Sequence, residues 1–134
     1  MNKKQISFGL LISAICIGYI VSSCKKTVTD TTKPTVSVEE PIANDTMSVT
    51  GDSVHVEFIA KDDIGLKQVA VAIKNMAGTI LYSDTLNVDS LIYYYHNHYV
   101  PKGITALTPL VLTATASDKS ANTSTQTVNF YIKP

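Results

Sequence analysis

The three histidines of the chain have a spacing that suits a metal ion. His96 and His98 are two residues apart in an aromatic run with strand character, so their side chains share one face. If this run pairs antiparallel with the strand that carries His55, all three imidazoles meet, with Glu57 two residues from His55. Two histidines from one strand and one from its neighbour can bind zinc tetrahedrally. The alternative is that all three are ordinary exposed side chains.

Oxygen ligands gather in two predicted turns. Asp62 and Asp63 lie in one turn, Asp118 and Asn122 lie in another, and Asp30 precedes the first strand. Calcium binds about six to eight oxygen atoms, which carboxylates converging from loops supply. Aspartate and asparagine are also common turn residues, because they accept hydrogen bonds from their own backbone. The sequence has no D-x-D-x-D spacing, so calcium binding and plain turn formation both stay open.

The aromatic run also carries a candidate binding surface. We expect its odd-numbered residues, Leu91, Tyr93, Tyr95 and Tyr99, to face the core. The even-numbered residues then point outward, and amphipathic rings on an exposed strand suit contacts with a sugar or a protein. The alternative is packing against the linker or a neighbouring subunit. The outward stripe consists of Ile92, Tyr94, His96 and His98.

Neither catalysis nor nucleic-acid binding is expected. The charges of the 11 basic and 11 acidic side chains cancel, and lysines do not cluster outside the N-terminus. The basic surface expected of a protein that binds nucleic acid is therefore missing. The sequence contains no G-x-S-x-G motif and no glycine-rich phosphate loop. No nucleophile, base and orienting group can be assembled from it. The only cofactor that the residues suggest is a zinc or calcium ion.

The N-terminal segment predicts export. Lys3 and Lys4 precede an apolar run at residues 6–21, which is shorter than the about 20 apolar residues of a membrane span. The run ends at residues 21–24 in the sequence VSSC, which resembles the bacterial lipobox. Residues 1–23 are therefore a predicted lipoprotein signal peptide. Cys24 is the predicted attachment point for diacylglycerol, because its thiol can form the thioether to the lipid.

The residues that follow predict a tethered domain. Cys16 lies in the signal peptide, so the mature chain has no disulfide. Residues 24–33 form a lipidated, polar and threonine-rich tether, and residues 34–134 form the domain. Lys25 and Lys26 follow the cysteine, which by resemblance to Gram-negative sorting rules favours the outer membrane. Whether the domain faces the periplasm or the outside stays open.

Residues 35–134 predict an all-β fold. Short β-rich runs recur between glycine, asparagine, aspartate and proline residues, and no helical period appears. Val54, Val56 and Phe58 alternate with polar residues, as in a strand with one buried face, and so do the in-phase residues of the run 79–88, Ile80, Tyr82, Leu86 and Val88. We expect a single immunoglobulin-like two-sheet sandwich of about seven antiparallel strands. The predicted runs are 35–39 with a short continuation at 46–50, then 53–61, 69–73, 79–88, 91–100, 110–116 and 128–132.

Two segments carry a family resemblance. GDSVHVEFIAKDDIGLKQVAVAI and LTATASDKSANTSTQTVNFYI resemble the bacterial immunoglobulin-like domains of exported proteins, notably Bacteroidetes lipoproteins. In that group Ala-x-Asp precedes a Gly-Leu turn and, later, a Gly-Asn-like turn, where this chain has Ala121. The resemblance implies a fold and no specific activity. Cadherin-like relatives use calcium sites between strands. Immunoglobulin topology also implies that the N-terminus lies beside the turns at residues 62–65 and 118–122.

These patterns together predict a membrane-anchored envelope lipoprotein. Its domain is expected to be a non-catalytic binding or structural module for a glycan or another envelope protein. The alternative is an accessory domain that binds zinc or calcium. Thr31 and Thr46 follow aspartates in sequences that resemble the Bacteroidetes O-glycosylation sequon, and they lie in the tether and in a predicted loop.

Overall fold

The computed structural model describes residues 29–48 and 53–134. The predicted signal peptide, Cys24 and the first part of the predicted tether lie outside the described residues. Within the described part of the chain, every regular element is a strand. None of these residues forms a helix with the length and apolar character needed to cross a membrane.

The described residues form six strands, where the sequence predicted about seven. The numbers differ because two pairs of predicted strands are continuous, while the predicted continuation at 46–50 is a separate strand. The runs at residues 53–61 and 69–73 are the two arms of one long strand, and so are the runs at residues 79–88 and 91–100. The strands are β1 (Thr35–Glu40), β2 (Thr46–Ser48), β3 (Val54–Asn75), β4 (Ile80–Tyr99), β5 (Thr108–Asp118) and β6 (Thr123–Lys133).

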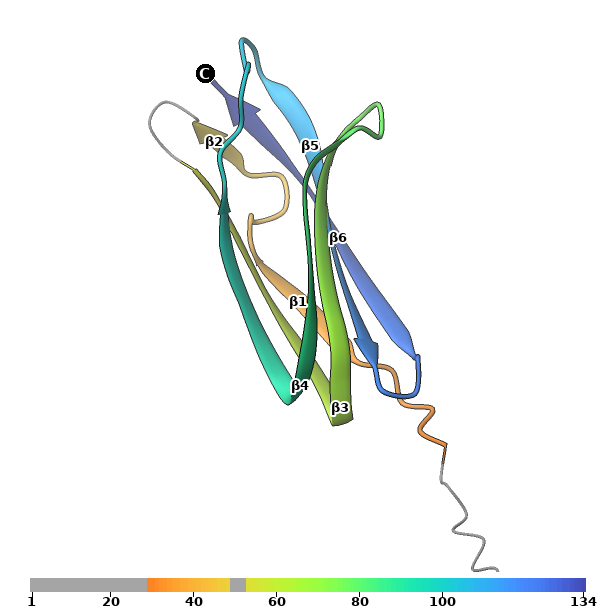
Figure 1. Cartoon of the computed structure of the whole chain (residues 1–134). Coiled ribbons are helices and arrows are strands. Elements are labelled where there is room, and N and C mark those ends of the chain that lie inside the picture. The colour runs from red at the N-terminus through yellow and green to blue at the C-terminus, as the bar shows by residue number, and fades with distance from the viewer. Residues whose placement is uncertain (1–28, 49–52) are drawn as a thin grey trace, which may run out of the picture.

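The two long strands, β3 and β4, are paired antiparallel and bend together (Figure 1). Their pairing is interrupted between Lys61 and Leu66, and this stretch forms the corner of β3. Gly65 has a φ of 151° there, a backbone conformation that residues with a side chain rarely adopt. The predicted turn at residues 62–65 is therefore a bend within a strand, after which the chain enters a second layer.

The bend curls one hydrogen-bonded sheet into two packed layers (Figure 1). In the first layer, the first arm of β3 pairs with β1 and with the second arm of β4. In the second layer, the second arm of β3 pairs with the first arm of β4 and with β5, which pairs with β6. The predicted all-β class is confirmed, with both layers parts of the same curled sheet.

One strand departs from the predicted antiparallel pattern. β2 pairs parallel with β6, and Met47 lies opposite Ile132. After Pro41 the chain crosses from β1 to β6, where the backbone amide of Asn44 donates to the carbonyl of Asn129 at 2.7 Å. β2 and β6 both run away from the end at which the N-terminal segment enters (Figure 1), so their pairing is parallel.

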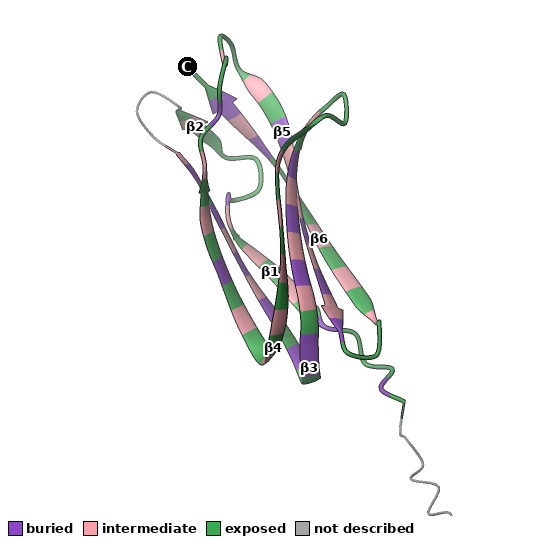
Figure 2. Cartoon of the chain, in the orientation of Figure 1, coloured by how far each residue is buried: buried purple, intermediate pink, exposed green. Residues whose placement is uncertain are grey.

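Alternating apolar and polar side chains build the core between the layers, as the sequence predicted (Figure 2). Phe58 and Tyr95 stack within it, with ring centroids 4.7 Å apart. Ile80 and Leu91 were predicted to face inward, but both are exposed. Ile80 begins β4 beside a turn and Leu91 lies at the bend of the strand, so the opposite layer does not cover them. The fully buried core residues include Val56, Phe58, Leu66, Ile73, Leu110, Leu112, Phe130 and Ile132.

Replacing Phe58 with alanine is expected to lower the free energy of unfolding by about 3–5 kcal/mol, because the substitution leaves a cavity in the core. Chemical unfolding followed by circular dichroism measures this change. Tyr94→Ala is the matched control, since its ring is 68% exposed and its loss is expected to change the free energy by less than about 0.5 kcal/mol. Equal effects of the two substitutions would contradict the central position of Phe58.

Candidate functional site

The incoming chain meets three bends at one end of the sandwich, which we call the entry end. The corners of β3 and β4 and the β5–β6 turn form this end, and residues 29–34 join the domain there (Figure 1). Asn122 in the β5–β6 turn donates its side-chain amide to the backbone carbonyls of Asp30 and Thr32, both at 3.1 Å. The predicted position of the N-terminal segment beside this turn is confirmed.

Three aspartates converge at the entry end. Asp30, Asp62 and Asp118 are only 8%, 9% and 0% exposed, and each comes from a different segment. One carboxylate oxygen of each lies within 4.8 Å of the others. Asp63, which the sequence grouped with them, is exposed and lies outside this cluster. Asn122 belongs to the cluster through a 2.6 Å hydrogen bond from its amide to Asp118 Oδ2.

Each of these carboxylates also shapes its own segment. Asp62 Oδ1 accepts hydrogen bonds from the backbone amides two and three residues further on, at 3.1 and 2.6 Å. Asp118 Oδ1 accepts from the amides two and four residues further on, both at 2.8 Å. Asp30 Oδ1 accepts from the amide two residues further on, at 2.9 Å. The turn chemistry that was the alternative to calcium binding is therefore present, and it occupies one oxygen of each aspartate.

The remaining oxygen of Asp62 is unusual. Oδ2 is buried and has no hydrogen-bond partner. Among the described residues, no ion pair reaches Asp30, Asp62 or Asp118. Burial raises the pKa of Asp118, but hydrogen bonds from Asn122, from the Ser120 amide and from the side chain of Asp30 outweigh it, so this pKa lies below its usual range. The cluster therefore places buried negative charge at the entry end without a described counter-charge.

The three histidines meet on the outer face of the first layer. The antiparallel register sets His55 opposite His98 and Glu57 opposite His96. The ring centroid of His98 lies 4.4 Å from that of His55 and 5.0 Å from that of His96. The rings of His55 and His96 are 6.0 Å apart. The sequence-based expectation that β3 and β4 bring these residues together is correct as geometry, whereas metal binding stays a prediction.

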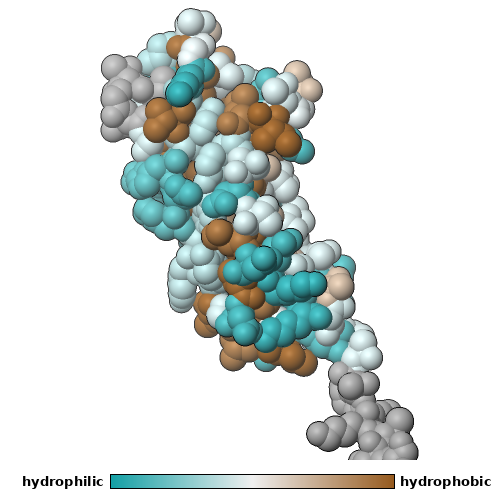
Figure 3. Space-filling view, in the orientation of Figure 1, coloured by the Kyte–Doolittle hydropathy of each residue, from teal (hydrophilic) through white to brown (hydrophobic). Residues whose placement is uncertain are grey.

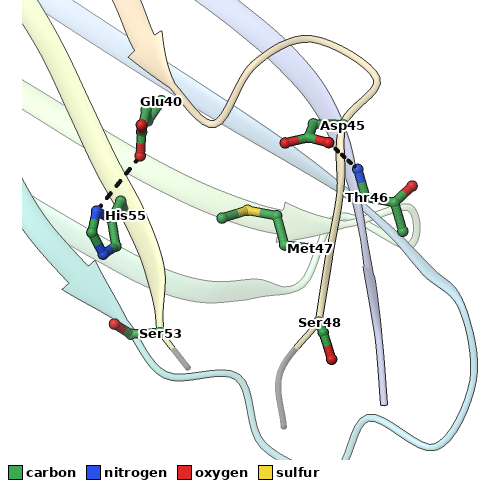
Figure 4. A pocket seen from close by; sticks show the side chains of 7 residues that line it. All are labelled: Glu40, Asp45, Thr46, Met47, Ser48, Ser53 and His55. Carbon is green, nitrogen blue, oxygen red and sulfur yellow. Dashed lines mark hydrogen bonds and ion pairs between the residues drawn. The ribbon is translucent and has the colours of Figure 1, made fainter. Parts of the chain in front are cut away.

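Oxygen atoms surround the histidine cluster. Glu40 and Ser53 were not predicted as parts of it. A hollow of 480 Å³ lies beside His55, and Figure 4 shows Glu40 of β1 directed toward the imidazole there. Each histidine has an oxygen near Nδ1: Glu57 Oε1 at 2.8 Å from His96, Ser53 Oγ at 2.9 Å from His98, and Glu40 Oε2 at 3.6 Å from His55.

The predicted outward stripe of β4 is exposed. Tyr94 is 68% exposed and Ile92 is 45% exposed, and the two histidines of the stripe are exposed as well. Leu91 and Ile92 also border a shallow hollow of 470 Å³ at the entry end. Figure 3 shows hydrophobic side chains among polar ones on this end of the molecule. Among the described strands β4 pairs only with β3, so the stripe lies on an edge strand.

The two predicted glycosylation positions differ in their surroundings. Thr31 and Thr46 are both exposed. Thr46, however, is the first residue of β2 and does not lie in a loop as the sequence predicted, because the chain pairs with β6 as soon as it has crossed the sandwich. Modification at either position stays a prediction.

Comparisons with known proteins bear on the fold. No protein-family model and no curated protein matches this sequence. Among solved structures, the E. coli chaperone DraB is similar, with a TM-score of 0.53 and 5% identity over 77% of this chain and 56% of that chain. The periplasmic chaperone SfaE has a TM-score of 0.51 and 8% identity over 75% of this chain and 57% of its own.

This chain therefore spans less than two thirds of either chaperone. At sequence identities this low, the structural similarity is evidence for the fold alone. Both chaperones have immunoglobulin-like β folds, so the similarity confirms the immunoglobulin-like fold that the sequence predicted.

Proposed function

We propose that this chain is an envelope lipoprotein, anchored through Cys24, whose immunoglobulin-like domain is a non-catalytic binding or structural module. The VSSC sequence at residues 21–24 supports the anchor. The position of the N-terminal segment at the entry end supports an orientation in which this end faces the membrane and the C-terminus points away (Figure 1). Lys25 and Lys26 favour the outer membrane.

The observation that carries the binding role is the exposed edge strand β4. Its outward stripe presents Tyr94 and Ile92 on a rigid strand, and its free edge lies next to no other described strand. Exposed aromatic rings supply contact area to a partner, and an unpaired strand edge offers backbone donors and acceptors. A strand of another protein can pair with such an edge, which favours a protein over a glycan as the partner.

The surroundings of the polar side chains support a non-catalytic role. Ser53 Oγ lies 2.9 Å from His98 Nδ1, which is the one contact that resembles a nucleophile and a base. His98 is exposed on an open strand face. Acyl transfer needs preorganised donors in a site that excludes water. This pair therefore does not favour hydrolysis.

A second candidate function is an accessory domain that binds calcium at the entry end. The observation that favours it is the buried Asp62 Oδ2 without a partner, within a cluster that also holds Asp30 and Asp118. Burying several carboxylates without a counter-charge costs free energy, and a divalent cation with oxygen ligands offsets that cost. Calcium at this position would join the N-terminal segment to two turns of the domain.

The proposed lipid anchor is tested with the variant Cys24→Ala. The substitution is expected to move the protein from the membrane fraction to the soluble fraction, because no thiol remains to carry diacylglycerol. Mass spectrometry of the mature N-terminus detects the lipid directly. Cys16→Ser is the control, since this residue lies in the predicted signal peptide and its loss leaves the anchor intact. Membrane attachment of Cys24→Ala equal to that of the wild type would contradict the proposal.

The binding surface is tested by photo-crosslinking in cells. A photoreactive residue at position 94 is expected to give one specific protein adduct, because this position lies at the centre of the stripe. The control carries the same group at Thr127, which is exposed on β6. Tyr94→Ala is expected to weaken the purified complex at least about 30-fold, as for a central aromatic contact worth about 2 kcal/mol. Identical adducts at both positions, or none at position 94, count against this surface.

Calcium binding predicts a metal-dependent stability. The wild-type melting temperature is expected to rise with calcium and to fall when a chelator is added, because a ligand that binds only the folded state stabilises it by about 2.7 kcal/mol at 100 times its dissociation constant. Asp62→Asn is expected to abolish the shift. Asp63→Asn is the matched control, because Asp63 is adjacent, exposed and outside the cluster. If both variants keep the calcium shift, the aspartates serve turn formation alone.

A further inference from the structure

We propose that His55, His96 and His98, which we call the histidine patch, form a zinc site on the outer face of β3 and β4. This site is separate from the aspartate cluster, because the patch lies on the sheet face and the aspartates lie at the entry end. His96 and His98 also belong to the outward stripe of β4, but zinc binding by the patch does not require the proposed partner. The inference stands on ring positions, on nitrogen separations and on the oxygen atoms around the rings.

The backbone holds the patch in a regular register. The β3–β4 pairing is unbroken from Val54 to Lys61, and the histidines lie within that stretch. His55 and His98 are direct cross-strand partners, and His96 lies two residues along the same face. The chain has no other histidine. A rigid pair of strands therefore presents every imidazole of the protein to one small region of solvent.

The Nε2 atoms of His96 and His98 are spaced like two ligands of one tetrahedral ion. The Nε2 atoms of His96 and His98 are 3.1 Å apart. Two nitrogens bound at about 2.0–2.1 Å in a tetrahedral zinc site are about 3.3 Å apart, so this pair needs almost no movement. The His55 ring is already in edge contact with His98, with centroids 4.4 Å apart. One nitrogen of His55 lies within 4.8 Å of carboxylate oxygens of Glu40 and Glu57, so His55 joins the other two histidines as a ligand only after a change of its side-chain rotamer.

The Nδ1 atoms of His96 and His98 each have an oxygen within hydrogen-bond distance, which leaves their Nε2 atoms for the metal, whereas Glu40 lies only at ion-pair distance from Nδ1 of His55. Glu57, Ser53 and Glu40 place an oxygen 2.8, 2.9 and 3.6 Å from the Nδ1 atoms of His96, His98 and His55, respectively. Metal-binding histidines commonly donate their second ring N–H to such an oxygen, which sets the tautomer and the ring orientation. The two glutamates also add negative charge beside a cation.

The side chains of the histidine patch do not contribute to the hydrophobic core. They lie on the outer face, and the His55 and His96 side chains are 46% and 58% exposed. The core packs against the opposite face of the same strands. Three nitrogen ligands with an open fourth position leave room for water or for a donor from a partner. Imidazole ligands suit zinc, and copper and nickel bind them as well, so the metals must be compared.

The test is a zinc titration of the untagged mature chain against a competing chromogenic chelator. One zinc per chain is expected. Each of His55→Ala, His96→Ala and His98→Ala is expected to weaken binding at least 10-fold, because each removes a ligand. Glu57→Gln keeps all three ligands and is expected to weaken binding by about 10–100-fold through the orientation of His96. Tyr94→Ala is the matched control on the same face and is expected to bind zinc like the wild type.

A second readout separates a built site from loose surface binding. Cobalt(II) at a tetrahedral nitrogen site gives visible absorption bands, which zinc is expected to displace and calcium is not. Circular dichroism establishes that each variant is folded, which is expected because all substituted side chains are exposed or half-exposed. Zinc affinities of the three histidine variants equal to that of the wild type, a stoichiometry other than one, or cobalt spectra of an octahedral aquo ion would overturn the proposal.

Discussion

The pairing of β3 with β4 is the constraint on which the rest of the structure depends. The two strands are paired on both sides of their bend, so a single antiparallel ladder contributes to both layers of the sandwich. The bend places their corners beside the β5–β6 turn, and that end receives the N-terminal segment (Figure 1). The same ladder sets His55 opposite His98. Core, entry end and histidine patch therefore follow from one register.

The two candidate metal sites differ in their physical setting. The carboxylates of Asp30, Asp62 and Asp118 are buried, and an unpartnered oxygen remains among them. Burying charge without a counter-charge costs free energy, so a cation bound there stabilises the entry end. The histidine patch is exposed, and neutral imidazoles tolerate exposure without a metal. A metal there acts on the surface properties of β4 and has little influence on the core.

Sequence periodicity predicted most of the inward and outward assignments, because a strand with one buried face must alternate. It was wrong at Leu91 and Ile80, where the chain bends or begins a strand and neither face is covered. It also separated runs that are continuous, because turn-forming residues such as Asp62 and Gly65 signal a change of direction and not the end of hydrogen bonding. Glu40 was missed as a neighbour of His55 because it comes from another strand, and Ser53 was missed because it contacts His98 across to β4 and not His55 in its own segment.

The sequence by itself determined the all-β class, the alternation of the strands and the expectation of an export signal and lipid anchor, since these are local patterns of residue type. Tertiary structure alone decided that β2 pairs parallel with β6, that the Asp62 Oδ2 atom is left without a partner, and that each imidazole of the histidine patch has an oxygen at Nδ1. These features depend on the register and layer of segments far apart in the chain. Local sequence does not specify such distances, because they arise when the whole sheet curls and packs on itself.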